Sequence, residues 1–488
     1  MELENQAASA LSVFSGLWAV AILFHYAAYP NGLIGIIPTV MMLAAVWVLF
    51  RPASLIRFLT MVALQVAAVA YAYPSGVSNH WLFAAFLNLA ILLAAGVLVL
   101  SRRDRLTPAD LFLTFAPAGR AALLVLYFFA VLHKLNWDFL NPEVSCATTL
   151  YGEIATAYAL PAPGWFLGAL PTLTLVVELA IPLLLIIPKT RVAGVLLGVC
   201  FHAALATSPA HTYSDFSSTV YAGYFLFLPY DFVGSLRADW SASAFGRWVA
   251  WQWDEGWLRH LVRGSLFLIV ALIAVNWWHQ AYYGPAVFTR LAPSTLRAAL
   301  IAVWCLYALT LLAVLVRAAW AMSLRRVTRP LLAARPRNAA LVAVPFIVVP
   351  LLLFNGLNPY FGLKTESSFS MFSNLRTEGG QTNHLFIPTG TQVFDYQKDL
   401  VEVLASSDPV LQGIAEDEHA LLFPYSEFRN RVASKKRASV TYLRNGQRHN
   451  VARIGNDPVL SQPIPFHERK LLDFRLVDTY EAGFRCEH

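Results

Sequence analysis

The chain has 488 residues, a formal net charge of +7, 57% hydrophobic side chains and only 13% charged ones. About a quarter of the residues in an ordinary soluble domain are charged, so this composition excludes a typical soluble protein and favours a membrane protein. No Walker loop, GxGxxG, CxxC or HExxH motif occurs, which leaves nucleotide binding and a local zinc motif without support.

Charge is unevenly distributed along the chain. Residues 1–356 carry 21 basic and 13 acidic side chains, whereas the shorter stretch 357–488 carries 15 and 16. We therefore expect an all-α polytopic membrane bundle over 1–356, followed by a small extracytoplasmic α+β domain over 357–488. All of the net positive charge lies in the membrane part. We therefore interpret this charge as a sign of membrane topology rather than of nucleic-acid binding. The expected partner is the lipid bilayer, not a nucleic acid.

Apolar runs of about 18 residues or more are typical of membrane-spanning helices. Only Glu2 and Glu4 precede the first run, with no basic segment, so we expect a retained span rather than a cleaved signal peptide. Some runs are short enough to be tilted, re-entrant or merged, and the sequence predicts about eight to eleven spans. The runs are 11–29, 32–50, 54–73, 80–100, 119–137, 171–188, 192–207, 216–229, 264–279, 297–317 and 339–356.

The basic residues of the membrane part fall into alternate loops. One set of loops holds 17 of them, from Arg51 to Arg337, while the other set holds only Arg290, with Arg297 at a boundary. Cytoplasmic loops are enriched in Lys and Arg. We therefore expect a cytoplasmic N-terminus and residues 357–488 on the outer side of the membrane.

The segment 127–140 places Lys134 within about one turn of the outer end of an apolar run. Two interpretations are open: Lys134 reaches the interface or pairs with Asp138, or it is a buried functional group. Lys134 and Lys189 are the only lysines among the first 356 residues, which hold 19 arginines. Since a desolvated lysine can accept a proton near neutral pH and an arginine cannot, Lys134 is the first candidate for chemistry.

Three further polar residues are predicted at the same depth. His80 opens one span from the outer side, Glu178 lies seven residues into another, and His202 lies five residues before the outer end of a third. At 1.5 Å per residue, these groups and Lys134 fall within roughly 10 Å of the outer boundary. Each alone is explained by capping or an internal hydrogen bond, but together they predict a polar cavity lined by several helices.

After residue 356 the pattern becomes that of a soluble domain. Residues 355–360 predict a turn-rich exit from the membrane, and 370–380 an outer segment that covers the bundle. Asn445-Gly446, between the runs 438–443 and 449–454, predicts a hairpin with a type I′ turn. Two further strands and a short helix are expected at 383–388, 470–477 and 398–406, respectively.

Four cysteines are too few for a disulfide framework. On the inferred topology Cys146 and Cys486 lie on the outer face, whereas Cys200 and Cys305 lie within spans and are expected to remain thiols. An oxidising outer compartment permits a Cys146–Cys486 disulfide, and the alternative is that both cysteines are free.

Several segments resemble the vitamin K-dependent gamma-carboxylase family, including its bacterial relatives with the horizontally transferred transmembrane (HTTM) domain. The segment 127–139 is similar to the family's aromatic-rich stretch ending in K-L-[DN]-x-D-[WF], and Asn79-His80 matches an Asn-His before a span. Phe201-His202 followed by Phe216-Ser217 resembles a Phe-His segment preceding a Phe-Ser span, and Glu178 falls where the family carries an acidic residue. The resemblance covers most of residues 10–400.

The resemblance implies an integral membrane enzyme, here of a bacterial plasma membrane. Lys134 would be the base that takes a proton from a reduced, vitamin K-like quinone. The quinolate would react with O2 to give a strong base that removes a proton from an unactivated C–H group, to which CO2 adds. Catalytic roles are further implied for His80 and His202, and quinone binding for His80, His202, Glu178, Asn79 and Tyr127. Reduced quinone, O2 and CO2 are the expected co-substrates, and no metal is needed.

The chain also departs from this family. Animal carboxylases continue for several hundred residues beyond the membrane region, partly to hold a propeptide-bearing substrate, whereas this sequence stops at His488. The carboxylated peptide or small molecule therefore stays open. Two alternatives from other classes are a non-enzymatic transporter and a quinone- or lipid-binding redox accessory protein, although no inverted repeat or pair of broken helices supports a transporter.

Overall fold

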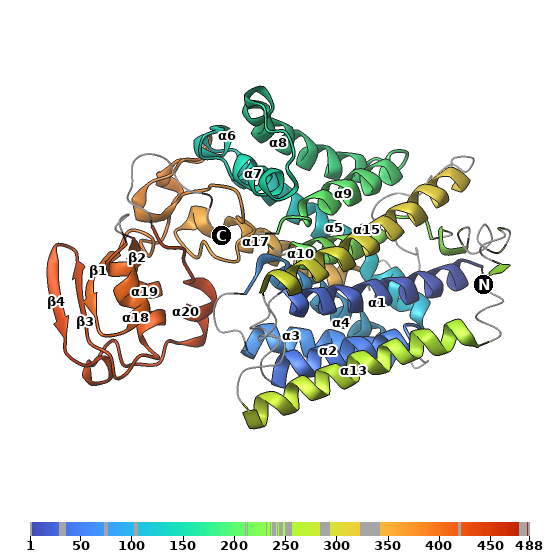
Figure 1. Cartoon of the computed structure of the whole chain (residues 1–488), viewed down its shortest axis with the longest axis horizontal. Helices are drawn as coiled ribbons and strands as arrows, with labels where there is room; N and C mark the ends of the chain where they lie inside the picture. The colour runs from blue at the N-terminus through green and yellow to red at the C-terminus, as the bar shows by residue number, and fades with distance from the viewer. Residues whose placement is uncertain are drawn as a thin grey trace.

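A computed structural model shows a helical bundle with a smaller sheet-containing part at one of its ends (Figure 1). The structure describes residues 2–28, 36–72, 77–101, 106–209, 211, 213–230, 232–234, 236, 241, 243, 247, 248, 256–283, 293–322, 342–417, 421–477 and 486. Helices dominate, and the strands belong to the C-terminal region, which confirms the predicted helical bundle followed by a small α+β part.

The helices follow the predicted apolar runs closely. Among the described residues, six helices are long and apolar enough to cross a membrane: Glu2–Ala28, Asn79–Ser101, Pro108–Lys134, Gly164–Ile186, Thr295–Ala319 and Val344–Phe361. Shorter apolar helices cover Ile36–Phe50, Leu55–Tyr71 and Arg191–Leu205. A membrane protein is thus indicated, while the count of eight to eleven spans stays a prediction. The bundle elements are α1 (Glu2–Ala28), α2 (Ile36–Phe50), α3 (Leu55–Ala67), α4 (Asn79–Ser101), α5 (Pro108–Lys134), α6 (Trp137–Leu140), α7 (Cys146–Tyr158), α8 (Gly164–Ile186), α9 (Arg191–Leu205), α10 (Ser214–Phe225), α13 (Trp257–Tyr283), α15 (Pro293–Met322) and α17 (Val348–Phe361).

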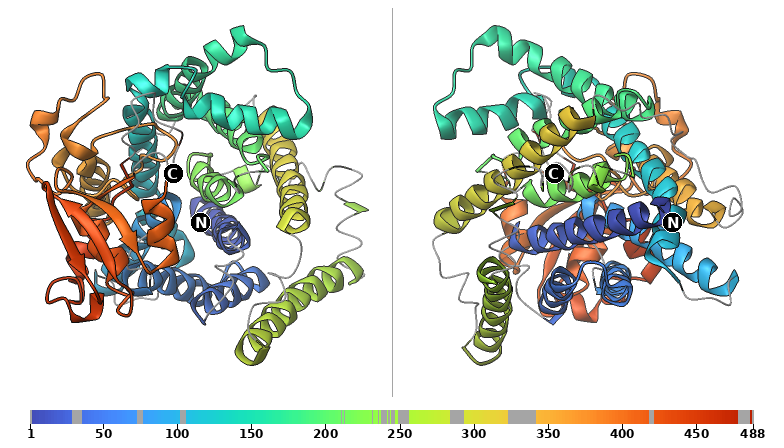
Figure 2. Two further views of the ribbon diagram at one scale, coloured as in Figure 1. Left: turned by 60° about the vertical axis from the view of Figure 1, so that its left-hand side comes forward. Right: turned by 90° about the vertical axis from the view of Figure 1, so that its right-hand side faces the viewer.

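Helices α1 and α5 lie at the centre of the bundle, and α13 packs along α2 at its periphery (Figures 1 and 2). A buried chain of hydrogen bonds ties α1, α3 and α4 together. Trp18 Nε1 donates to Asn88 Oδ1 (2.8 Å), and Asn88 Nδ2 donates to Gln65 Oε1 (2.9 Å). Polar groups without water nearby must find partners within the protein, so this chain sets how the three helices align.

The C-terminal part contains an antiparallel sheet of order β2-β1-β3-β4. The predicted hairpin is confirmed: β3 and β4 pair directly, with Asn445 (φ 52°) and Gly446 (φ 73°) in the left-handed region that a type I′ turn requires. Buried Val401, Phe423 and Phe428 form a separate core beneath the sheet. Its elements are β1 (Leu400–Ser406), α18 (Pro409–Ala415), β2 (Leu422–Pro424), α19 (Tyr425–Val432), β3 (Val440–Arg444), β4 (Gln447–Val451) and α20 (Phe466–Leu471).

Four local predictions for the C-terminal region are wrong. The expected helix at 398–406 is strand β1, because buried Val401 and Val403 alternate with less buried neighbours and pair with strands from distant sequence. The expected exit turn at 355–360 is still helical, since α17 accommodates Pro359 and ends at Gly362 (φ 80°). Of the strands expected at 383–388 and 470–477, the described structure has only single bridges, Asn136↔His384 and Leu422↔Val477.

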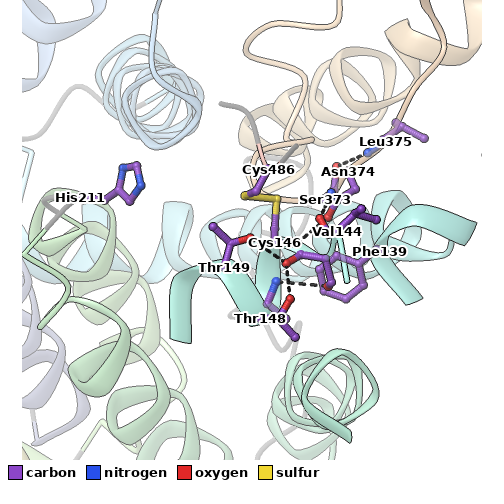
Figure 3. The surroundings of a disulfide bond; sticks show 12 residues. Phe139, Val144, Cys146, Thr148, Thr149, His211, Ser373, Asn374, Leu375 and Cys486 are labelled. Carbon is purple, nitrogen blue, oxygen red and sulfur yellow. Dashed lines mark hydrogen bonds between the residues drawn. A yellow bond between two sulfur atoms is a disulfide. The ribbon is translucent and has the colours of Figure 1, made fainter. Parts of the chain in front are cut away.

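A disulfide joins Cys146, at the start of α7, to Cys486 near the chain end (Figure 3). Their Cα atoms lie 4.7 Å apart, a normal spacing for such a bond, and Cys146 is fully buried. Cys200 and Cys305 are free thiols. Of the two alternatives from the sequence, the structure therefore has the disulfide, which joins Cys486 to the start of α7.

We predict that removing this disulfide destabilises the protein. The bond closes a loop between residues 340 positions apart. In the chain-entropy model such a loop contributes about 6 kcal/mol, an upper value because membrane anchoring already restricts the unfolded chain. The Cys146→Ser variant should therefore unfold at a lower temperature, with Cys200→Ser as the control. Alkylation of all four cysteines in wild-type protein prepared without reductant would contradict the bond.

A second prediction concerns pH. Burial raises the pKa of the Glu427 carboxyl on α19 from 4.5 to about 7. A raised carboxyl pKa gives stability that is complete below about pH 4.5 and is lost as the pH rises through about 7. Because one pKa unit corresponds to about 1.4 kcal/mol, Glu427→Gln should stabilise the sheet at pH 8 by up to about 3 kcal/mol and have little effect near pH 4.

Hydrogen exchange of the β1 and β3 amides measures this effect, and comparing variant with wild type at one pH cancels the intrinsic pH dependence. Glu416→Gln, at an exposed position after α18, is the matched control and should be neutral at both pH values. Equal protection in Glu427→Gln and wild type at pH 8 would contradict the prediction.

Candidate functional site

The bundle encloses a cavity of about 280 Å³ at the end that faces the C-terminal part. Helices α5, α7, α8 and α9 supply most of its wall, the residues before and at the start of α10 supply another side, and the segment 369–372 closes it. Most of the lining is apolar. The polar exceptions include five residues predicted from the sequence, namely Asn79, Tyr127, Lys134, Glu178 and His202.

Lys134 forms a buried ion pair with Glu178 inside this cavity. Its Nζ lies 2.8 Å from Glu178 Oε2 and 3.1 Å from Oε1, and it also donates to the carbonyl of Ala130 (3.3 Å). The two side chains are only 8% and 12% exposed. The alternative pairing with Asp138 does not occur, because Asp138 accepts a hydrogen bond from Asn383 Nδ2 (2.8 Å). Lys134 is thus a cation held in an apolar environment by one carboxylate from another helix.

The chain around Lys134 is positioned by Asn136. Lys134 is the last residue of α5, and Asn136 Oδ1 caps the short helix α6 by accepting from Phe139 N (2.8 Å). Asn136 Nδ2 donates to the carbonyls of His133 (2.7 Å) and Ser373 (2.6 Å). The same side chain therefore ends α5, begins α6 and attaches the segment that covers the cavity.

The wall residues Tyr127 and His202 form a second polar group together with Tyr224, which does not itself line the cavity. The Tyr127 hydroxyl lies 2.9 Å from His202 Nε2 and also hydrogen-bonds to the Tyr224 hydroxyl. Gly198 on α9 leaves room for the Tyr224 ring, since any Cβ there would overlap it. Tyr224 was not predicted, because one tyrosine among the aromatic residues of an apolar run carries no distinguishing signal.

The segment 367–374 covers the cavity in an unusual backbone conformation. Ser367, Phe369, Phe372 and Asn374 all have positive φ, between 52° and 66°. Such non-glycine residues are strained and persist where surrounding contacts hold them. Asn79 supplies one of these contacts, with its Oδ1 accepting from Phe369 N at 2.5 Å. The prediction that 370–380 covers the bundle is confirmed for its first part, which places Met371 and Phe372 in the cavity wall.

His80 is the one predicted site residue that is not among those lining this cavity. Its Nε2 lies 2.9 Å from His25 Nδ1 and 3.2 Å from Asp215 Oδ2. Phe216, which lines the cavity, contacts both the His80 ring (centroids 6.2 Å apart) and the His202 ring (5.3 Å). His25 and Asp215 were missed, although the shared-depth argument applies to both, since they also lie near the outer ends of predicted spans.

Comparison with protein-family models, with curated proteins and with solved structures finds no match for this chain.

We predict that the Lys134–Glu178 pair behaves as a buried, mutually dependent unit. Removing one partner leaves an uncompensated charge, so Lys134→Met and Glu178→Leu should each destabilise the protein by about 3–5 kcal/mol. The double variant should recover most of this loss, because it buries no charge. Reversible unfolding by SDS in mixed micelles measures the effect.

The exposed pair Lys398–Asp395 provides a matched control. Lys398→Met should change the unfolding free energy by less than about 1 kcal/mol. Additive losses at Lys134 and Glu178, with no recovery in the double variant, would show that the two charges do not depend on each other.

Proposed function

We propose that the protein is an integral membrane enzyme that uses Lys134 as a base toward a reduced quinone. The observation that carries the proposal is the Lys134–Glu178 pair in an apolar cavity at the membrane-embedded end of α5. An ionisable residue inside a membrane bundle is costly to bury and is a functional candidate by default. The activity is the one implied by the resemblance to vitamin K-dependent gamma-carboxylases: quinol oxidation by O2 coupled to carboxylation of a substrate.

The cavity is suited to a flat apolar ring with oxygen substituents. Its volume of about 280 Å³ lies just below the roughly 300–1,000 Å³ typical of ligand sites. A two-ring quinone head fits this scale, while an isoprenoid tail would extend into the bilayer. Apolar side chains would contact the rings, and the few polar groups would bind the oxygens.

The polar groups have distinct roles in this proposal. Lys134 passes its own proton to the Glu178 carboxylate, 2.8 Å away, and its neutral amine then accepts the hydroquinone proton. His202, held by Tyr127, contacts a quinone oxygen, and Asn79 offers its amide nitrogen while its oxygen holds Phe369. His80 acts through its neighbour Asn79 as a positioning residue. The bound quinol supplies the reaction with O2 and the strong base that precedes CO2 addition.

The cover over the cavity serves the same chemistry. Phe369, Met371 and Phe372 close the outer side with apolar surface. Excluding water strengthens the interactions of Lys134 with bound groups and protects a carbanion from protonation. A peptide or small-molecule substrate would approach from the side of this segment, where the disulfide fixes the neighbouring chain (Figure 3).

We also propose that the N-terminus is cytoplasmic and residues 357–488 lie outside the plasma membrane. The distribution of basic residues supports this orientation. The Cys146–Cys486 disulfide supports it independently, because such bonds persist in oxidising compartments outside the cytoplasm.

Conversion of added reduced naphthoquinone to its epoxide by membranes containing the protein tests the function. Lys134→Ala should abolish epoxide formation, and Lys134→Arg should reduce it at least about 100-fold, because arginine keeps the charge but cannot accept a proton. Lys189→Ala, in an exposed turn between α8 and α9, is the control and should retain wild-type activity.

Full activity of Lys134→Arg would reduce Lys134 to an electrostatic anchor and overturn the catalytic assignment. Quinone binding without epoxide formation in wild type would instead favour a redox accessory protein. If the wild-type protein neither binds the quinone nor forms the epoxide, a quinone is not its substrate and the proposal is wrong.

A further inference from the structure

Three side chains of types that can bind a metal ion come together from three helices, and His80, the central one, does not line the cavity. His25 lies in the last turn of α1, His80 in the first turn of α4, and Asp215 in the first turn of α10. All three residues are at least nine-tenths buried. Because the three residues are far apart in the sequence, no local sequence motif predicts the cluster.

The ligand atoms converge at the spacing of a coordination site. His80 Nε2 lies 2.9 Å from His25 Nδ1 and 3.2 Å from Asp215 Oδ2, and the three atoms all lie within 4.8 Å of one another. Metal–ligand bonds of about 2.0–2.1 Å place neighbouring ligands about 3.0 Å apart in octahedral and about 3.4 Å apart in tetrahedral geometry. Both short separations fall in or next to this range.

Hydrogen bonding alone accounts poorly for the arrangement. A neutral imidazole nitrogen either carries one hydrogen or accepts one. Yet His80 Nε2 faces His25 Nδ1, Asp215 Oδ2 and, at 3.4 Å, Ser78 Oγ. A metal ion between the first three atoms would be shared by all of them at once, whereas a single proton on Nε2 serves mainly one contact.

We propose that His25, His80 and Asp215 bind one divalent transition-metal ion. Two imidazoles and one carboxylate suit Zn²⁺ or Fe²⁺, whereas Mg²⁺ and Ca²⁺ prefer oxygen ligands. The ion joins the outer ends of α1, α4 and α10, and the His25 ring is further held by stacking on Trp81 (centroids 3.9 Å apart).

This ion would position the cavity wall without taking part in the reaction. Asn79 and Phe216, the sequence neighbours of His80 and Asp215, both line the cavity. Fixing the two ligands therefore fixes the two wall residues beside them. No step of the proposed quinol chemistry passes through the ion, so the two proposals fail or succeed independently.

The test measures metal in the full-length chain, purified in detergent with a tag that contains no histidine. Elemental analysis should find about one Zn or Fe per chain. After chelation, the protein should bind Co²⁺ with the visible absorption of a nitrogen- and oxygen-ligated ion, and Zn²⁺ should displace it. His25→Gln and Asp215→Asn should each weaken Co²⁺ binding more than about 100-fold. Replacing a residue that only hydrogen-bonds to a metal ligand typically weakens binding by about 10- to 100-fold.

His202→Gln is the matched control, since it changes a buried histidine of the cavity and should keep metal binding. Metal binding by chelated wild-type protein is a second measurement, and its result does not depend on whether any variant folds correctly. If it binds neither Co²⁺ nor Zn²⁺ at micromolar concentration, or if His25→Gln and Asp215→Asn bind as wild type does, the cluster is a hydrogen-bonded network and the proposal is overturned.

Discussion

The ion pair between Lys134 and Glu178 is the constraint around which the membrane part is arranged. An ammonium group that is only 8% exposed in an apolar bundle needs a carboxylate at hydrogen-bonding distance, and Glu178 supplies it from α8. The pair therefore determines how the end of α5 faces α8, and the cavity lies where these helices and α9 meet. If Lys134 is also the proposed base, its replacement affects stability and chemistry together.

The segment 367–374 covers the cavity, and its own conformation depends on contacts with the bundle. Contacts with the bundle hold its left-handed residues: Asn79 Oδ1 accepts from Phe369 N, and Asn374 Oδ1 accepts from Cys146 N (2.8 Å). Asn136 Nδ2 also donates to the carbonyl of Ser373, between Phe372 and Asn374. The disulfide fixes the same region from the far end of the chain. Strain of this kind is tolerated where contacts over-determine it, and here those contacts surround the cavity.

In each of two pairs of adjacent residues, Asn79-His80 and Asp215-Phe216, one side chain lines the cavity and the other belongs to the cluster with His25. Asn79 and Phe216 face the cavity, while His80 and Asp215 face His25. Neighbouring residues at the start of a helix point in different directions, so one turn can serve two sites. A metal ion at the proposed site would hold His80 and Asp215, and with them the adjacent wall residues Asn79 and Phe216.

The amino-acid sequence by itself determined the apolar helices, the grouping of Lys134, Glu178 and His202 around one cavity, the type I′ hairpin and the two cysteines able to pair. These features follow from composition, local periodicity and turn chemistry, which act over a few residues. Only the tertiary structure decided that Glu178 rather than Asp138 neutralises Lys134, that Tyr224 joins Tyr127, and that His80 turns toward His25 and Asp215. It also made 400–406 a strand, because pairing with β2 and β3 outweighs local preference. Contacts between residues tens to hundreds of positions apart depend on how helices and strands pack, and no local pattern encodes that packing.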